Sequence, residues 1–401
     1  MSRMRIPPAI FAMLTALAGG VALTACAAQG PASPSGSASG SAFGSARHAR
    51  TSLASALSVT RPSGRTRPAG QPASVSARAV PGNPGGRAYV PPAGRPVNTS
   101  HPNHVIGHGT AASCTSRAVV RAVAEGGVIT FRCGPRPVTI VMTATAKVRN
   151  TSRRVVLDGG GKVTLSGGGV RRILYQDTCD KRQVWTTSHC QDQATPALVV
   201  QNLTFVRGNS TGQHFDGGGG GAIFDRGGQL KVVNSRFIDN RCDATGPDLG
   251  GAAIRALSQY RNRPVYIVRD TFRGGVCSNG GALSSIGVSW TVLNSVMSGN
   301  RAIGRGANPA QHGTPGGGSG GAIYNDGDRY TVLIKGTVIR YNLAREGGGA
   351  VFFVSDNNTG TLRIEYSTLH HNPSEGFFTQ GYPGIFFHST GHPIVIHSKL
   401  N

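Results

Sequence analysis

The sequence predicts an all-β fold, a single-stranded parallel β-helix, from a repeat of glycines and a repeat of apolar runs. Gly-Gly-Ala occurs five times, with steps of 30, 30, 40 and 28 residues between occurrences. Each occurrence is followed by two β-rich runs of Val, Ile, Leu and Phe, and this composition favours strands over helices. The second runs lie at residues 231–237, 266–272, 291–297, 332–339 and 362–369, and an earlier run without the glycines lies at 198–205.

One repeat of about 30 residues is too small to bury its own apolar face, so successive repeats are expected to stack. The diglycine then marks a corner where φ is positive or two backbones approach closely. A column of asparagines supports the register, because each lies three residues beyond the last apolar residue of a run; its members are Asn240, Asn300, Asn342 and Asn372. Gly275 breaks the column. Stacked asparagines would satisfy each other's amides from one repeat to the next.

The pattern Gly-Gly-Ala-[Ile/Val/Leu], a β-rich run and then Val-x-Asn-Ser-x-Phe-x-x-Asn resembles the repeat proteins of the pectin-lyase-like superfamily. It also resembles the repeats of polymorphic outer-membrane proteins. The resemblance covers about residues 155–400 and implies a right-handed parallel β-helix. It implies little about activity, because this scaffold serves lyases, hydrolases, esterases and adhesins.

The segment before the repeats is expected to cap the stack. Residues 115–125 carry apolar residues at helical spacing, with Ser113 or Thr115 as N-cap and Gly126-Gly127 as terminator. We therefore assign residues 101–154 to an N-terminal cap with the first strands and residues 155–401 to the β-helix.

The amino terminus is typical of an exported lipoprotein. Arg3 and Arg5 precede an apolar run over 10–23, which is too short to span a bilayer. The run ends in Leu-Thr-Ala-Cys, similar to a lipobox, so residues 1–25 are expected to be a signal peptide and Cys26 the lipidated residue. Residues 26–100 are rich in Ala, Ser, Pro, Gly and Arg and are expected to form a disordered tether across a thick cell wall, which with the arginine bias suggests an actinobacterium.

Six cysteines remain after Cys26, an even number that indicates disulfides in an exported chain. Fifteen pairings are formally available. We expect sequence neighbours to pair: Cys114 with Cys133, Cys179 with Cys190, and Cys242 with Cys277. None of their spacings is typical of a zinc site or of a redox motif.

The folded part is strongly basic. Residues 1–100 hold ten of the 41 Lys and Arg and none of the 17 Asp and Glu, which leaves 31 against 17 and a formal charge of +14 for residues 101–401. Such a surface favours polyanions. Outside the cell we expect an acidic polysaccharide or cell-wall polymer as partner, membrane contact through the lipid anchor only, and no specific nucleic acid.

Loops that arrive just before the diglycine corners are expected to line one edge of the stack and to wall a groove. Four residues near it are candidate catalytic groups, namely Asp216, Asp225, Asp248 and Arg255. Elimination from a uronide needs its carboxylate neutralised before a base removes a proton, and carboxylates beside an arginine have that form. No cofactor is certain, but Ca²⁺ would suit the carboxylates. The alternative is that these residues cap turns.

A second set of residues is a candidate for substrate binding: Trp185, Tyr260, Tyr324, Asp326 and Asp356. The aromatic rings would stack on sugars. Asp326 and Asp356 are expected on neighbouring repeats, about 5 Å apart. Gly107-His108-Gly109 matches the GHG tripeptide of polygalacturonases but precedes the β-helix, so it is not assigned a catalytic role.

Three functions therefore stay open. The first is binding of an acidic polysaccharide in the loop-lined groove, and the second is a polysaccharide lyase or glycoside hydrolase at the same place. The third is a structural or adhesive envelope protein, which needs no groove. No nucleophile elbow, P-loop or dinucleotide-binding fingerprint lies in a suitable context.

Overall fold

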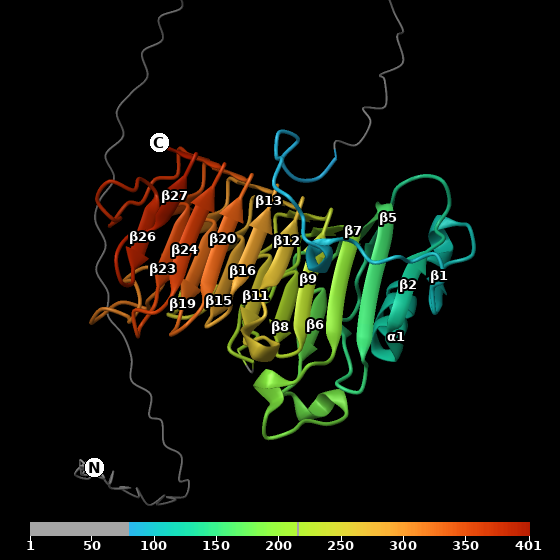
Figure 1. The fold of residues 1–401 in the computed structure, drawn as a ribbon. Coiled ribbons are helices and arrows are strands. Elements are labelled where there is room, and N and C mark those ends of the chain that lie inside the picture. Colours follow the sequence, from blue (N-terminus) through green and yellow to red (C-terminus); the bar gives the residue numbers. More distant parts are fainter. Residues whose placement is uncertain (1–79, 215) are drawn as a thin grey trace, which may run out of the picture. The chain divides into compact units, whose positions relative to one another are not determined.

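The computed structural model describes residues 80–214 and 216–401. The expected signal peptide, Cys26 and residues 27–79 of the expected tether lie outside the described residues. The described part is predominantly β, with parallel sheets of 17, eight and three strands (Figure 1). We call these sheets A, B and C.

The strands of each sheet follow one another along the stack. Sheet A contains β1 His104–Ile106, β2 Gly127–Phe131, β3 Val138–Val141, β5 Arg154–Ser166, β7 Ala197–Val206, β9 Gln229–Val233, β10 Arg236–Ile238, β12 Val265–Val268, β13 Thr271–Arg273, β16 Trp290–Leu293, β17 Val296–Ser298, β20 Thr331–Lys335, β21 Val338–Arg340, β24 Thr361–Glu365, β25 Thr368–His370, β27 Ile394–Ile396 and β28 Lys399–Leu400. Sheet B contains β4 Ala146–Lys147, β6 Leu174–Asp177, β8 Ile223–Arg226, β11 Ile254–Leu257, β15 Leu283–Ile286, β19 Ile323–Asp326, β23 Val351–Val354 and β26 Ile385–His388. Sheet C contains β14 Val276–Cys277, β18 Arg301–Ala302 and β22 Leu343–Ala344.

Each repeat of the chain makes one pass through the sheets in a fixed order. The pass that begins at β8 enters sheet B, continues through β9 and β10 in sheet A, and returns to sheet B at β11. Every pass lies parallel to the one before and in register with it, so Ile223 pairs with Ile254 and Ile254 with Leu283. The apolar residues of all passes thereby form one continuous core.

The second β-rich run of each repeat is two strands rather than the single strand that the sequence predicted. The chain bends at a residue with positive φ between them: Asn234, Arg269, Asn294, Gly336 and Tyr366, with φ from 47° to 63°. Both strands place side chains in the core, for example Val232 before the bend and Phe237 after it. A run of apolar residues does not reveal the bend, because asparagine and glycine signal it in only three of these five repeats.

The two glycines of a corner are required for different reasons: the first has a positive φ, and the second is packed closely against a neighbouring backbone. Gly220 has φ of 64°, and a Cβ there would come within 2.4 Å of the Ile223 carbonyl oxygen. A Cβ on Gly221 would come within 2.1 Å of the Arg241 carbonyl oxygen on the next pass. In the second repeat the register differs from the predicted one by a residue, since Gly251 has the positive φ of 72° and Ala252 follows it.

The predicted asparagine column is buried and runs from pass to pass. The Asn300 side-chain amide donates to Asn342 Oδ1, and the Asn342 amide donates to Asn372 Oδ1, both at 2.8 Å. At the gap, the Gly275 backbone N–H donates to Asn300 Oδ1 at 3.0 Å. Three phenylalanine rings stack beside this column with centroids 5.1 and 4.8 Å apart, in the order Phe205, Phe237 and Phe272.

The predicted capping helix is α1, Ser116–Glu125. Thr115 is its N-cap, with the Ala118 backbone N–H donating to Thr115 Oγ1 at 3.2 Å, and Gly126 ends it with φ of 80°. Val119 and Val123 are buried in the core at the end of the stack beside β1 and β2 (Figure 1).

The three disulfides join the sequence neighbours: Cys114 with Cys133, Cys179 with Cys190, and Cys242 with Cys277. The first joins the start of α1 to the end of β2. Three disulfides indicate that the protein folds in an oxidising or extracellular environment. In the part of the chain that the structure describes, no helix combines the length and apolar composition needed to cross a bilayer.

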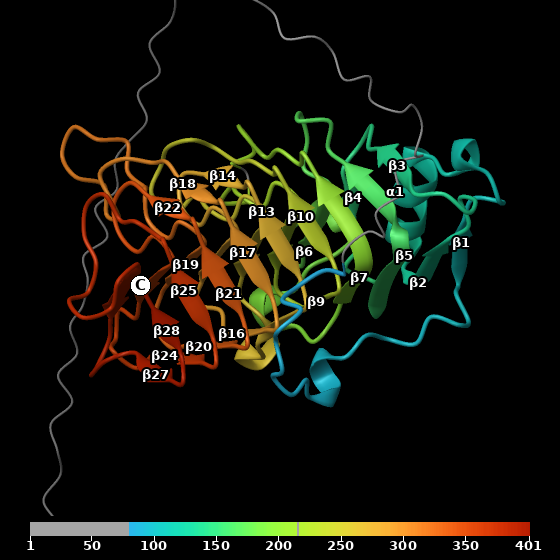
Figure 2. The same cartoon turned by 90° about the horizontal axis from the view of Figure 1, so that it is seen from above.

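Residues 80–100 were assigned to the disordered tether, and the structure corrects this boundary. They form an extended segment, which we call the strap, that crosses the outer face of sheet A (blue in Figures 1 and 2). The Ala88 backbone N–H donates to Asn294 Oδ1, and the Asn294 side-chain amide donates to the Ala88 carbonyl, both at 2.8 Å. Gln201 holds Val97 in the same way, at 2.8 and 2.9 Å.

The strap also covers apolar side chains that face outward from sheet A. Ala88 and Val90 pack against a cluster of Val233, Val268 and Leu293, and Val97 packs against Val128, Val156 and Val199. Composition does not reveal this segment, because the apolar residues that Ala88 and Val90 cover lie more than 100 residues away in the sequence.

We expect Asn294→Gly to release the strap. Glycine keeps the positive φ of 52° but removes both bonds to Ala88. Hydrogen exchange of residues 80–95 should become faster, and trypsin should cleave after Arg87 more readily. Asn234→Gly is the matched control, because Asn234 has the same φ and bonds to Asn202 instead of the strap. Equal exchange in the two variants would contradict the role of Asn294.

Asp270 interrupts a buried column of hydroxyl side chains. The Asp270 backbone N–H donates to Ser295 Oγ at 3.1 Å. In the same way the Ser295 backbone N–H donates to Thr337 Oγ1 on the next pass, at 3.2 Å. Burial raises the pKa of the Asp270 carboxyl well above its usual value, and hydrogen bonds from the backbone N–H groups of Ser235 and Val268 only partly oppose this. The carboxylate is therefore unfavourable inside the stack at neutral pH.

We expect Asp270→Ser to stabilise the protein by about 1–2 kcal/mol near pH 7, because it removes a buried charge. A raised pKa in the folded state means that the unfavourable effect of Asp270 is absent below the unfolded pKa of about 4 and develops as pH rises above it. The gain in melting temperature should therefore be larger near pH 7 than near pH 4. A gain independent of pH would show that packing, rather than charge, is responsible.

Candidate functional site

The candidate site is a cavity of about 490 Å³ on the outer face of sheet B. It lies at the edge of the stack that is lined by the loops before the diglycine corners. Its wall residues come from β8, β11, β15 and β19 and the residues that follow these strands, from the turn after β23, from the loops before two corners, and from the loop of residues 178–196. They are Gln191, Gly217, Arg226, Asp248, Arg255, Leu257, Ser258, Ile286, Asp326, Gly327 and Asp356.

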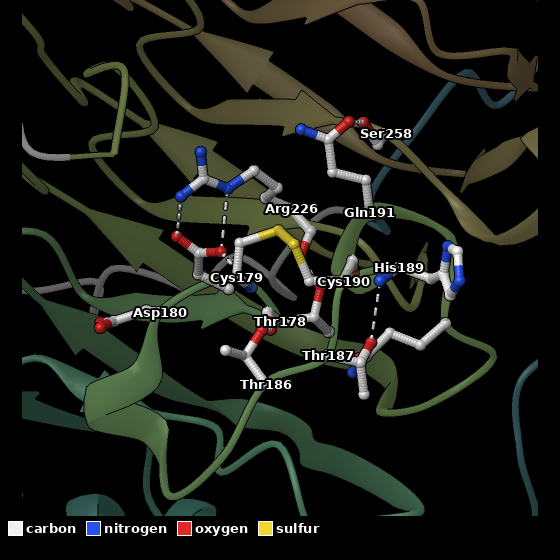
Figure 3. The surroundings of a disulfide bond; sticks show 12 residues. Thr178, Cys179, Asp180, Thr186, Thr187, His189, Cys190, Gln191, Arg226 and Ser258 are labelled. Carbon is white, nitrogen blue, oxygen red and sulfur yellow. Dashed lines mark hydrogen bonds and ion pairs between the residues drawn. A yellow bond between two sulfur atoms is a disulfide. The ribbon is translucent and has the colours of Figure 1, made fainter.

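The loop closed by the Cys179–Cys190 disulfide forms one wall. Figure 3 shows Gln191, Arg226 and Ser258 around that disulfide, and all three line the cavity. Arg226 is held by the buried Asp177, with Arg226 Nη2 donating to Asp177 Oδ2 at 2.5 Å. Burial opposes the charge of Arg226, but the carboxylate of Asp177 raises the pKa of its guanidinium. This arginine is therefore neutralised by its own partner.

Arg255 is a second arginine at the cavity and lacks such a partner. It is 2% exposed; its Nη1 donates to Ser284 Oγ at 2.5 Å and its Nη2 to the Asp248 carbonyl oxygen, while Nε has no hydrogen-bond partner. Within residues 80–214 and 216–401, no carboxylate forms an ion pair with it. Burial lowers the pKa of its guanidinium, and Tyr324 and Asp248 partly offset this.

A chain of hydrogen bonds joins two of the candidate carboxylates. Asn308 donates to Asp248 Oδ1 at 2.7 Å and to Tyr324 Oη at 2.5 Å, and Tyr324 Oη donates to Asp326 Oδ2 at 2.8 Å. Burial and the neighbouring carboxylates raise the pKa of the Tyr324 hydroxyl, so it keeps its proton. The lengths of the three bonds set an upper limit of about 8 Å between Asp248 Oδ1 and Asp326 Oδ2.

Asp326 is the carboxyl most suited to hold a proton in this cavity. Burial raises its pKa, and so does the charge of Asp356, although the bond from Tyr324 opposes the shift. Asp356 lies one pass further, where its backbone N–H donates to the Gly327 carbonyl at 2.9 Å. Asp248 and Asp356 are both exposed at the cavity.

Two of the candidate catalytic aspartates lie elsewhere and do not line the cavity. Asp216 is buried in an ion pair with Arg172 at 2.6 Å and accepts a bond from the Gly218 backbone at 3.0 Å, so it holds a corner. Asp225 is fully buried, and Gln176 and Gln259 donate to its carboxyl. Burial raises the pKa of Asp225 well above its usual value.

Strand alternation explains this difference. Asp225 pairs in register with Ala256, whose side chain lies in the core, and Asn325 is a further buried member of the same column. Arg226 instead pairs with Leu257 at the cavity. Sequence reasoning placed Asp225 after a corner without fixing which face it occupies, and a shift of one residue exchanges the faces.

The predicted aromatic residues are dispersed. Tyr324 belongs to the site through its hydroxyl, but its ring is buried and stacked on Phe352 at 5.0 Å. Trp185 is 40% exposed and Tyr260 lies between Arg261 and Arg263, and neither lines the cavity. The apolar part of the wall consists of Leu257 and Ile286 instead.

Sequence reasoning did not single out Arg226, Asn308 or Gln191. Arg226 occupies the outward position next to Asp225, so the alternation of the strand was the available signal. Asn308 and Gln191 lie on long loops, where no periodicity indicates which side chains face the cavity.

The structure offers little support for Ca²⁺. Among the described residues, no three side chains of His, Cys, Asp or Glu come together in a way that would hold a metal ion. Asp248 and Asp326 are instead bridged by Asn308 and Tyr324. Comparison with protein-family models, with curated proteins and with solved structures finds no match for this chain.

Proposed function

We propose that the protein is an exported right-handed parallel β-helix of the pectin-lyase-like type, lipid-anchored at Cys26, that binds acidic polysaccharide in the cavity on sheet B. The order of sheets in each pass supports the fold, since parallel connections are overwhelmingly right-handed. The disulfides and the lipobox-like sequence support display outside the membrane.

The observation that carries this proposal is Arg255, a buried arginine that no carboxylate of the described chain neutralises. A guanidinium pairs well with a planar carboxylate, through two parallel hydrogen bonds where both donors are free. A uronic acid supplies that carboxylate on a sugar ring. Binding would place the missing negative charge beside Arg255 and satisfy its free Nε.

The rest of the cavity suits a sugar. Asp248 and Asp356 are exposed acceptors for hydroxyl groups, and Leu257 and Ile286 offer apolar contacts for ring C–H groups. Arg226 is already paired with Asp177, so it adds a hydrogen-bond donor without a second free charge.

We expect Arg255→Met to weaken binding of polygalacturonate about 10- to 100-fold, the loss typical of one hydrogen bond to a charged group. The melting temperature should stay the same or rise, because methionine removes an unpaired buried charge. Arg117→Met, on the exposed face of α1, is the control for loss of one positive charge. Calorimetric titration with polygalacturonate and with neutral amylose measures the effect.

Two results would contradict the role of Arg255. One is unchanged affinity in a folded Arg255→Met protein. The other is binding of amylose as tight as that of polygalacturonate by the parent protein, because a site built around Arg255 must distinguish a carboxylate from a hydroxymethyl group.

A second candidate function, glycoside hydrolysis, is favoured by the raised pKa of Asp326. A hydrolase needs one protonated carboxyl and one ionised carboxylate, separated by about 5–5.5 Å for retention or about 6.5–9.5 Å for inversion. The limit of about 8 Å from Asp248 to Asp326 permits either arrangement. Asp326 would be the acid, and Asp248 or Asp356 the nucleophile or base.

If the protein hydrolyses the glycan, new reducing ends should appear, and Asp326→Asn should lower the rate by about 100-fold or more. Activity should fall as pH rises through the raised pKa of Asp326, since the acid must carry its proton. Glu375→Gln, at an exposed position outside the cavity, is the control. Absorbance of unsaturated uronides would instead indicate elimination. If no acidic glycan yields either new reducing ends or unsaturated uronides, the protein binds glycan without cleaving it.

A further inference from the structure

Five arginines form a second charged feature, which we call the basic stripe. It consists of Arg207, Arg241, Arg273, Arg301 and Arg340, one from each of five successive passes. Figure 2 shows β10, β13, β17 and β21, the strands along which the stripe runs, side by side.

The register of the strands fixes this arrangement. Arg273 and Arg340 belong to one outward column, because each pairs with Ser298 on the pass between them. Arg241 and Arg301 belong to the neighbouring column, and each pairs with Val276. The two columns alternate, so these four arginines fall one to a pass rather than side by side. Arg207, on the first pass, lies outside both columns but lines the same hollow as Arg241.

All five side chains are exposed. Within the described ranges none of them forms an ion pair, and Arg340 contacts only the Tyr341 ring among aromatic groups, at 6.0 Å. Arg207 and Arg241 line a hollow of about 450 Å³ together with Asp239. Asp239 is the single carboxylate in that hollow, so the stripe keeps a positive charge along its length.

Successive passes lie about 4.8 Å apart, so five arginines span about 19 Å. Charges that advance by one pass, alternating between two neighbouring columns, are matched by an extended polymer with one negative charge on each monomer. Duplex DNA is a poorer match, because it carries one charge per about 1.7 Å on two strands that wind around the axis.

We propose that the basic stripe binds a linear acidic glycan lengthwise, with one carboxylate near each arginine. The identity of the polymer rests on the proposed function, but the site is a different one: the stripe lies on sheets A and C and the cavity on sheet B. A long polymer would be retained by the stripe while one of its uronic acids occupies the cavity of the same or another molecule.

The test is to replace Arg241, Arg273 and Arg301 together by serine and to titrate the full exported chain with polygalacturonate at about 0.05–0.3 M salt. Affinity at low salt should fall about 10- to 100-fold, and the dependence of affinity on salt should become weaker. The matched control is Arg117→Ser, Arg136→Ser and Arg153→Ser in one protein, which removes the same charge from exposed positions outside the stripe.

Chain length gives a second measurement. Affinity should rise with the length of the oligouronate until the oligomer spans the stripe, and this rise should be absent in the triple stripe variant. Equal affinity of the stripe and control variants, with equal dependence on length, would overturn the proposal. Tighter binding of duplex DNA than of polygalacturonate at the same salt would overturn it in favour of a nucleic-acid surface.

The two proposals fail in different ways. If the cavity proposal is wrong and the stripe proposal is right, Arg255→Met binds normally while the stripe variant loses affinity and its dependence on length. If the stripe proposal is wrong and the cavity proposal is right, only Arg255→Met loses affinity, and the loss is the same for short and long oligomers.

Discussion

Polar side chains inside the stack find their hydrogen-bond partners on the next pass of the chain, so a shift of register by one residue would leave a whole column unpaired. Asn300, Asn342 and Asn372 each depend on the neighbouring amide, and unpaired buried amides are costly. The corner glycines favour the same register, because Gly221 lies so close to the Arg241 carbonyl that a residue with a Cβ would not fit in its place. Every outward side chain therefore has a fixed place in a column.

This constraint explains how much of the fold could be predicted from the sequence. The asparagine column and the diglycine corners repeat at nearly regular spacing, and they indicate the stacked passes directly. The bend within each second run was missed because Arg269 and Tyr366 adopt positive φ as readily here as Asn234 does. The strap was missed because its partners, Asn294 and Gln201, act at a distance that no local pattern records.

The candidate site was predictable in part for the same reason. Asp248, Arg255, Asp326 and Asp356 meet at one cavity, as expected of residues that flank the corners of successive passes. Asp225 was misplaced because the direction of a strand residue depends on its exact register, which the shift at Gly251 and Ala252 also shows. The loop residue Asn308 obeys no repeat, so its bridge between Asp248 and Tyr324 could be found only in the structure.

The strap decides which faces remain for binding. It covers the outward apolar residues of sheet A, including Val233, Val268 and Leu293, so that surface is closed to a partner. The exposed arginines of the basic stripe and the cavity on sheet B stay open. The basic stripe exposes several unpaired charges to solvent, and the cavity buries a single unpaired arginine. Salt should therefore weaken attraction at the stripe far more than at Arg255. A polyanion would thus be captured through screened charges and recognised through a buried one.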